Sequence, residues 1–268
     1  MKQAHYDQLY NQANVGYHGP KFSYSEMPDQ YTFAAFQRNV LTPGHKPVMA
    51  EIDTTTSHIP WAPLPTMVPW NKVGNGSVFD PQPAQSESAA TVWRNGNTVK
   101  QFYGQSIQYS LKALTSWVTE LNDPNLVLIF MGDHQPHTVV SGYGATHDVP
   151  VSIVTRAPSV LRQMSSWHWQ NGLLPNPVAP VEPMDAFRNQ FLNTFSTAPN
   201  GSGQVAGVVD AMDGGKSAAV PPDLVNAGGA EIQPVKGAKR DAESPAQQDL
   251  YRGNVADHQD GLAAVVPQ

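Results

Sequence analysis

The chain has 268 residues, a formal net charge of −6 at pH 7 and no cysteine. The lack of cysteine excludes disulfides, thiolate metal sites and thiol catalysis. The basic residues form no stripe that could neutralise a phosphate backbone, so we expect no nucleic-acid binding. No stretch approaches the about 18 apolar residues of a membrane-spanning helix. The first residues contain no apolar signal-peptide core, so these features by themselves predict no route out of the cytosol.

The composition changes near Thr197 and predicts two regions. Up to that residue the chain is rich in Trp, Tyr, Phe and branched aliphatic residues, whereas beyond it Trp and Phe do not occur and small or polar residues dominate. Such a segment buries too little apolar surface to offset the entropy lost on ordering it. We therefore expect one folded region over residues 1–196 and a disordered low-complexity tail over residues 197–268.

The first predicted elements are a helix and a short strand. Apolar residues at helical spacing predict an amphipathic helix between Asp29 and Leu41, directly after Pro28. Residues 47–53 have the pattern of a short strand. Residues 66–96 are rich in Pro, Gly, Asn and Ser and predict a long loop, which in a compact domain is either functional or mobile.

The following elements alternate between helix and strand. Apolar residues recur at steps of three and four over residues 101–121 and predict a long helix. Residues 126–131 are apolar on both faces, which is typical of a strand buried at the centre of an α/β sheet. A strand over residues 149–154 and a helix over residues 184–195 follow. This order predicts a layered domain of the α/β class.

The strongest candidate site, Gly132-Asp133-His134, comes directly after the predicted central strand. Open α/β sheets bind ligands beyond the carboxyl ends of their strands. A carboxylate beside an imidazole supplies two ligands for zinc or manganese from one point of the chain. Gly132 would allow a sharp turn before the ligands. The same residues could instead form a turn cap beside a structural histidine, and the pattern favours neither interpretation.

A second histidine, His147, lies thirteen residues beyond His134 and just before the next predicted strand. A loop of that length can fold back and bring His147 to Asp133 and His134 as a third metal ligand. The alternative is an ordinary solvated loop residue, which is the commoner case.

A third histidine, His58, follows the strand predicted over residues 47–53 and precedes a rigid Pro-Trp pair. At that place it could bind an oxyanion or protonate a leaving group. It could equally be a histidine hydrogen-bonded within its own loop. The preceding hydroxyl residues, Thr54 to Ser57, are expected to form turns and caps, because a nucleophile needs a base or metal that spacing does not establish.

Taken in order, the segments Ser57–Trp61, Gly132–Pro136 and Val149–Val151 resemble the C-terminal half of bacterial sulfatase-like hydrolases. That group belongs to the alkaline phosphatase superfamily and includes lipoteichoic acid synthases and phosphoethanolamine transferases. The resemblance covers about Tyr6 to Phe195 and leaves out the tail. It implies an alkaline-phosphatase-like αβα sandwich and a metal-assisted attack on a phosphate or sulfate ester.

The resemblance also implies roles for single residues. Asp133 and His134 would be metal ligands, and His58 would contact the substrate oxyanion. His147 lies near a position where several relatives place a histidine. The implied cofactor is a divalent metal, zinc or manganese, and the implied partner is a phosphate- or sulfate-ester substrate. The full-length parent protein would act at the extracytoplasmic face of a bacterial membrane.

The sequence departs from the family pattern at its beginning. The first strand of the family carries an acidic ligand and is followed by the nucleophile, and neither is recognisable here, because Glu51 and Asp53 lie on a later strand. We therefore expect a sandwich that is incomplete at the N-terminus, an unknown nucleophile, and a requirement for the N-terminal half of the domain. The expected function is a metal-dependent hydrolase or transferase within a longer chain. The alternative is a non-catalytic remnant or binding module that retains part of the metal site.

Overall fold

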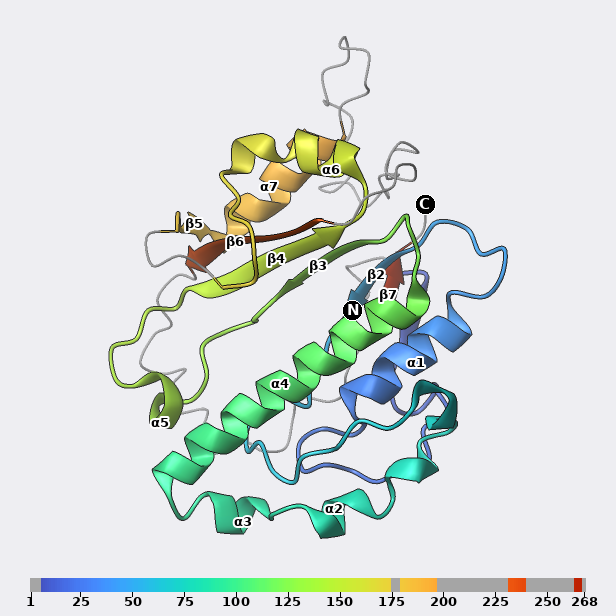
Figure 1. Cartoon of the computed structure of the whole chain (residues 1–268), viewed down its shortest axis with the longest axis vertical. Coiled ribbons are helices and arrows are strands. Elements are labelled where there is room, and N and C mark those ends of the chain that lie inside the picture. Colours follow the sequence, from blue (N-terminus) through green and yellow to red (C-terminus); the bar gives the residue numbers. More distant parts are fainter. Residues whose placement is uncertain (1–5, 175–178, 197–230, 240–262, 267–268) are drawn as a thin grey trace. The chain divides into compact units, whose positions relative to one another are not determined.

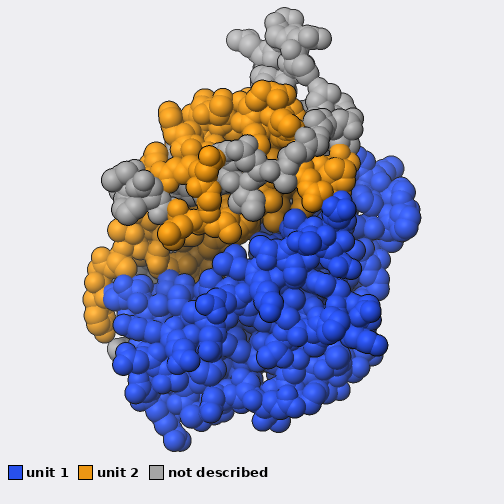
Figure 2. All heavy atoms as spheres, viewed as in Figure 1, with its two compact units in different colours: residues 1–122, 136–142, 257–268 blue, residues 123–135, 143–256 orange. Residues whose placement is uncertain are grey.

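The computed structural model describes residues 6–174, 179–196, 231–239 and 263–266. It contains both helices and strands, which confirms the α/β class in its general sense (Figure 1). No helix in these ranges is long and apolar enough to cross a membrane. The chain divides into two compact units, coloured separately in Figure 2. Unit 1 comprises residues 1–122, 136–142 and 257–268, and unit 2 comprises residues 123–135 and 143–256.

Unit 1 contains two helices that lie side by side, α1 (Asp29–Asn39) and α4 (Gly96–Leu121) (Figure 1). Trp117 of α4 contacts two aromatic rings of α1. Its indole stacks on Phe33 with ring centroids 5.2 Å apart and meets Phe36 edge-on at 6.0 Å. Aromatic pairs of this kind bury large apolar areas and prefer such geometries. Both helices confirm the predictions made from apolar spacing.

The ends of α4 are set by two asparagines. The Asn95 side chain accepts hydrogen bonds from the backbone N–H groups of Asn97 and Thr98, which caps the helix. The helix therefore begins before the predicted start at residue 101. Asn122 ends it in the left-handed conformation, with φ 45°, which asparagine tolerates better than most residues.

Unit 1 also contains a three-stranded antiparallel sheet with the order β1-β7-β2. Its strands are β1 (Gln8–Tyr10), β2 (Met49–Ile52) and β7 (Ala263–Val266). The strand β2 confirms the prediction over residues 47–53. The strand β7 lies within the predicted tail, of which residues 197–230, 240–262 and 267–268 are outside the described residues.

The long loop predicted over residues 66–96 contains four short helices. They are η1 (Trp70–Lys72), η2 (Ser77–Phe79), α2 (Gln82–Gln85) and α3 (Ala89–Val92). Two buried glutamines hold the start of this segment. The Gln30 amide donates to the Val68 carbonyl at 2.6 Å and accepts from the Val68 N–H at 3.0 Å. Gln82 bonds in the same two-point manner to Thr66. Each amide thus satisfies one backbone donor and one acceptor, as a neighbouring strand would.

A short helix, α5 (Thr138–Ser141), is part of unit 1 and lies against α4. The ring nitrogen Nδ1 of His137 accepts a hydrogen bond from the N–H of Val139 and so caps α5. The His137 ring also meets Trp93 edge-on, with centroids 5.6 Å apart. His137 is therefore engaged in holding this turn.

Unit 2 contains a four-stranded sheet with the order β3-β4-β6-β5. Its strands are β3 (Val127–Met131), β4 (Val149–Thr155), β5 (Glu182–Pro183) and β6 (Glu231–Lys239). The pairs β3–β4 and β4–β6 are antiparallel, and β5 runs parallel to β6. β6 is the second strand within the predicted tail.

The position of β3 differs from the prediction of a buried central strand. Within the described sheet it pairs with β4 alone and lies at the edge, and its residues are half-buried except Met131, which is exposed. The strand that is mostly buried is β4. The sequence prediction was wrong on this point because an apolar run indicates that side chains prefer to be covered, but not which strand its backbone pairs with.

Helices α6 (Pro158–Gln163) and α7 (Met184–Phe195), with the short η3 (Ser165–Trp167), pack against β3 and β4 (Figure 1). Ile129 and Ile153 lie opposite each other in the strand register and both contact this cluster. The Trp167 indole N–H donates to the Thr194 hydroxyl at 3.0 Å. α7 has the same bounds as the predicted helix.

Two segments of unit 1 approach each other closely at Gly76. The His18 N–H donates to the Asn75 carbonyl at 2.8 Å. Gly76 has φ +93°, and a Cβ at this position would lie 2.4 Å from the Tyr17 ring. Only glycine meets both requirements, because other residues strain at this φ and would collide with the ring.

We expect Gly76→Ala to lower the free energy of unfolding by more than about 1 kcal/mol, through backbone strain and the collision with Tyr17. Gly104→Ala is the matched control, because Gly104 lies within α4 and a Cβ there meets no atom within 4 Å. That substitution should raise the free energy of unfolding by roughly 0.5–1 kcal/mol. Urea unfolding of both variants measures the difference, and equal effects would contradict this account.

Candidate functional site

The candidate metal-binding residues lie at one end of the β3–β4 hairpin in unit 2. Met131, the last residue of β3, pairs with Val151 of β4. Asp133-His134 follows this pair on one arm, and His147-Asp148 precedes it on the other. The side-chain amide of Gln135 donates to the Asp148 carbonyl and joins the two arms. The antiparallel register therefore brings the predicted segments to the same end of the sheet.

Gly132 is not required by the backbone. It lacks a left-handed φ, and a Cβ there would make an ordinary contact of 3.6 Å with Val149. The backbone before the candidate ligands therefore does not adopt a turn that requires glycine.

Asp133 and His134 form a close pair on the surface. Asp133 Oδ2 lies 3.3 Å from His134 Nε2, and the two side chains are 78% and 40% exposed. Asp133 Oδ1 accepts a hydrogen bond from the His134 N–H at 2.9 Å. The carboxylate is thus turned toward the imidazole by the backbone of the next residue.

The contacts of His134 decide which ring nitrogen carries the proton. Nδ1 lies 2.7 Å from the carbonyl oxygen of Gln135. A carbonyl oxygen only accepts hydrogen bonds, so Nδ1 must donate and therefore carries a hydrogen. In the neutral ring Nε2 then has the lone pair, and Nε2 is the atom next to Asp133. A backbone carbonyl on the second ring nitrogen is the usual way to orient a metal-binding histidine.

The donor atoms and the spacing of this pair fit a divalent metal. Two ligand atoms that are each about 2.0–2.1 Å from a tetrahedral zinc lie roughly 3.3 Å apart. The separation of Asp133 Oδ2 and His134 Nε2 has this value. Carboxylate oxygen and imidazole nitrogen are donors that both zinc and manganese accept. The same separation is also that of an ordinary contact between a carboxylate and an imidazole, so the geometry is compatible with an ion without requiring one.

His147 does not complete a three-residue site. It is exposed on the loop before β4. Across the described residues, no three His, Asp or Glu side chains come together as a group that could hold a metal ion.

Asp148, the neighbour of His147, was not identified from the sequence. Its Oδ1 is buried and makes no hydrogen bond within the described ranges. The only sequence signal for Asp148 was an acidic residue directly before a strand.

His58 lies in unit 1, in the segment after β2. Its ring stacks on Tyr24 with centroids 3.6 Å apart and an interplanar angle of 17°. Its Nδ1 lies 2.6 Å from the Ile59 carbonyl oxygen, so this nitrogen also carries the proton. His58 belongs to unit 1, whereas Asp133 and His134 belong to unit 2. That His58 faces the same cleft as these two residues therefore stays a prediction.

Asp29 is a functional candidate that the sequence analysis missed. Its carboxylate is fully buried. Oδ1 accepts from the backbone N–H groups of Thr55 and Thr56 and from the Thr56 hydroxyl, at 3.1, 2.9 and 2.7 Å. Oδ2 accepts from the Ser110 hydroxyl at 2.5 Å. In the sequence Asp29 had only the pattern of an acidic residue in the first turn of a helix.

Burial raises the pKa of Asp29, and the hydrogen bonds from Ser110, Thr56 and Thr55 oppose this rise. The neighbouring Tyr109 hydroxyl is buried, and its pKa is also raised, first by burial and then by the Asp29 carboxylate. The site around Asp29 therefore disfavours negative charge, although the carboxylate accepts hydrogen bonds at both oxygens.

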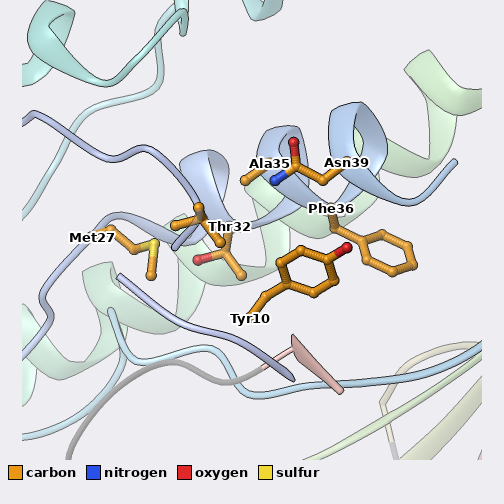
Figure 3. A pocket seen from close by; sticks show the side chains of 7 residues that line it. Tyr10, Met27, Thr32, Ala35, Phe36 and Asn39 are labelled. Atoms are coloured by element: carbon orange, nitrogen blue, oxygen red, sulfur yellow. The ribbon is translucent and has the colours of Figure 1, made fainter. Parts of the chain in front are cut away.

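A pocket lies beside α1 in unit 1 (Figure 3). Its lining is mostly apolar and consists of Tyr10, Val15, Met27, Thr32, Ala35, Phe36 and Asn39. None of the predicted site residues contributes to it. No chemistry is assigned to this pocket.

No family model matches this chain, and no curated protein or solved structure matches it either. The resemblance to sulfatase-like hydrolases therefore rests on the sequence motifs themselves.

We expect Asp29→Asn to change how stability depends on pH. The raised pKa of Asp29 in the folded state means that stability is present below the unfolded value of about 3.9. It is lost as pH rises through the folded pKa. Asparagine has the same shape, still accepts from Thr55 and Thr56, and can donate to Ser110, but it does not ionise.

The stability of the wild type relative to Asp29→Asn should therefore fall as the pH is raised from acid to neutral. Urea unfolding at a series of pH values measures this difference. Glu87→Gln, at an exposed position, is the control and should follow the wild type. A constant difference between wild type and Asp29→Asn would contradict the prediction.

Proposed function

We propose that this chain is part of a metal-dependent hydrolase or transferase that acts on phosphate or sulfate esters, within a longer polypeptide. The observation that carries the proposal is the pair formed by Asp133 and His134, whose Oδ2 and Nε2 atoms are 3.3 Å apart. The order of the three resembling segments, around His58, Asp133 and Val149, supports the sulfatase-like group. An alkaline-phosphatase-like αβα sandwich is part of the same proposal.

In this proposal Asp133 Oδ2 and His134 Nε2 hold zinc or manganese. His147, the third ligand predicted from the sequence, lies on the opposite arm of the hairpin and would have to move toward the pair to join it. The bound ion would polarise the ester oxygens and activate a nucleophile. The protein orients the two ligands, because the His134 N–H bonds Asp133 Oδ1 and the Gln135 carbonyl bonds His134 Nδ1.

His58 is proposed to contact the substrate oxyanion or to protonate the leaving group. Its Nδ1–H donates to the Ile59 carbonyl, which orients the ring. The nearby threonines are poor candidates for the nucleophile. The Thr55 hydroxyl bonds the Ser25 hydroxyl at 2.9 Å, and the Thr56 hydroxyl is bonded to Asp29. The nucleophile therefore stays unassigned.

The second candidate is a non-catalytic binding module that retains part of the metal site. The exposure of Asp133 and His134 favours this alternative. Catalytic metal ions act in shaped cavities from which water is largely excluded, whereas binding an ion at the surface needs no such cavity.

Titration of the purified, tag-free chain with zinc or manganese tests the metal site. We expect Asp133→Ala and His134→Ala each to weaken binding by at least about tenfold, because even outer-shell partners of metal ligands contribute 10–100-fold. His45→Ala is the matched control. His45 is exposed and has the same bond from Nδ1 to the next carbonyl, at 2.6 Å, but is preceded by glycine rather than aspartate. Equal binding by all four proteins would contradict both candidates.

The metal-loaded chain should then be assayed with aryl phosphate and aryl sulfate esters. Product release that is lost in Asp133→Ala would support an enzyme over a binding module. Metal binding without product release would exclude catalysis by this chain on its own and favour the binding module.

A further inference from the structure

The backbone of His58 is held by short-range hydrogen bonds. Its N–H donates to the Thr55 carbonyl at 3.0 Å, and its carbonyl accepts from the Trp61 N–H at 3.2 Å. The Trp61 indole N–H donates to the Ser57 carbonyl at 2.8 Å. The position of His58 therefore depends on where Thr55 and Trp61 are fixed.

On the C-terminal side of His58, Trp61 is fixed by an aromatic cluster. Its side chain is buried, stacks on Trp93 at 5.7 Å and meets Tyr103 edge-on at 5.2 Å. The Trp93 indole N–H donates to the Pro60 carbonyl at 3.0 Å. This side of the turn is thus held mainly by packed rings.

On the N-terminal side, Asp29 fixes the two threonines. Its Oδ1 accepts from both backbone N–H groups, of Thr55 and Thr56. The Thr56 hydroxyl donates to Oδ1 and also accepts from the Asp29 N–H at 3.0 Å. Because Asp29 begins α1, these bonds tie the turn to the helix.

The plane of the His58 ring is set by Tyr24 and Ile59. Tyr24 covers one face of the ring, and the Ile59 carbonyl accepts from Nδ1. The segment that carries Tyr24 is tied to the same turn, because the hydroxyls of Ser25 and Thr55 lie 2.9 Å apart. The bonds that place the ring thus lead back to Thr55, which is held by Asp29.

We infer that Asp29 is a positioning residue for His58, acting through Thr55 and Thr56 to fix the plane and the tautomer of the imidazole. The inference rests on the proposed function in so far as His58 is the residue that meets the substrate. The carboxylate suits this role because it accepts at both oxygens. With Oδ2 bonded to Ser110, it joins α1, α4 and the turn at one point.

Nitrogen-15 NMR of the histidine rings in the whole chain tests this inference, with His58→Gln assigning the signals. The key variant is Thr56→Val, which removes the hydroxyl, keeps the backbone N–H and has nearly the same volume. We expect it to shift the His58 ring signals and to lose the dominance of the Nδ1–H tautomer. Thr56→Ser retains the hydroxyl and should restore the wild-type signals.

Two controls distinguish a specific effect on the position of the His58 ring from a general loss of order in the protein. His45 has the same local Nδ1 bond but is not a hydrogen-bond partner of Asp29, Thr55 or Thr56, so its signals should not move in any variant. Ser110→Ala removes the bond to the opposite carboxylate oxygen. It should lower stability and leave the His58 signals unchanged. Should Thr56→Val fail to fold, Asp29→Asn replaces it and should give a smaller shift of the same signals.

Wild-type His58 signals in a folded Thr56→Val or Asp29→Asn variant would overturn the inference. Equal shifts in Ser110→Ala would also overturn it, because they would indicate a general loss of order. The measurement uses neither metal nor ester. A chain that binds no metal but shows these shifts would therefore refute the proposed function while the positioning of His58 by Asp29 stands.

Discussion

The arrangement of unit 1 depends on one buried carboxylate. Removing a charge from water is costly unless hydrogen bonds replace the lost solvation. Asp29 receives such bonds from Thr55, Thr56 and Ser110, and these residues come from two places far apart in the sequence. The bonds that offset the cost of burial are therefore the same bonds that hold α1, α4 and the His58 turn together. Loss of any one partner would leave the remaining charge less well compensated.

The candidate residues of the two units share a local device but differ in their surroundings. His45, His58 and His134 all donate from Nδ1 to the carbonyl of the next residue. This bond fixes the tautomer but is no sign of function by itself, since it also occurs at His45. Function is proposed for His134 because of the Asp133 carboxylate beside Nε2, and for His58 because of its ordered turn. The three histidines thus share a local geometry and differ in their tertiary surroundings.

Apolar periodicity predicted the elements whose side chains face one packed layer. The helix α7 has the predicted bounds, and β2 and β4 lie where strands were expected. The position of β3 could not be predicted, because an apolar strand does not encode which backbone it pairs with. The short helices within residues 66–96 could not be predicted either. This segment is held by side-chain amides such as that of Gln30, which lies far from its partner Val68 in the sequence.

The sequence by itself determined the chemistry that is available: no thiol, the adjacent pair Asp133-His134 after an apolar strand, and a histidine before a Pro-Trp turn. It also determined the three longest helices, α1, α4 and α7, and the strands β2, β3 and β4, since their patterns are local. The tertiary structure decided that Asp133 and His134 face each other at the end of an antiparallel hairpin and that Asp148 lies on the other arm. It also decided that Asp29 is buried beneath the His58 turn. These facts depend on strand register and on contacts between distant segments, and no local pattern records either of them.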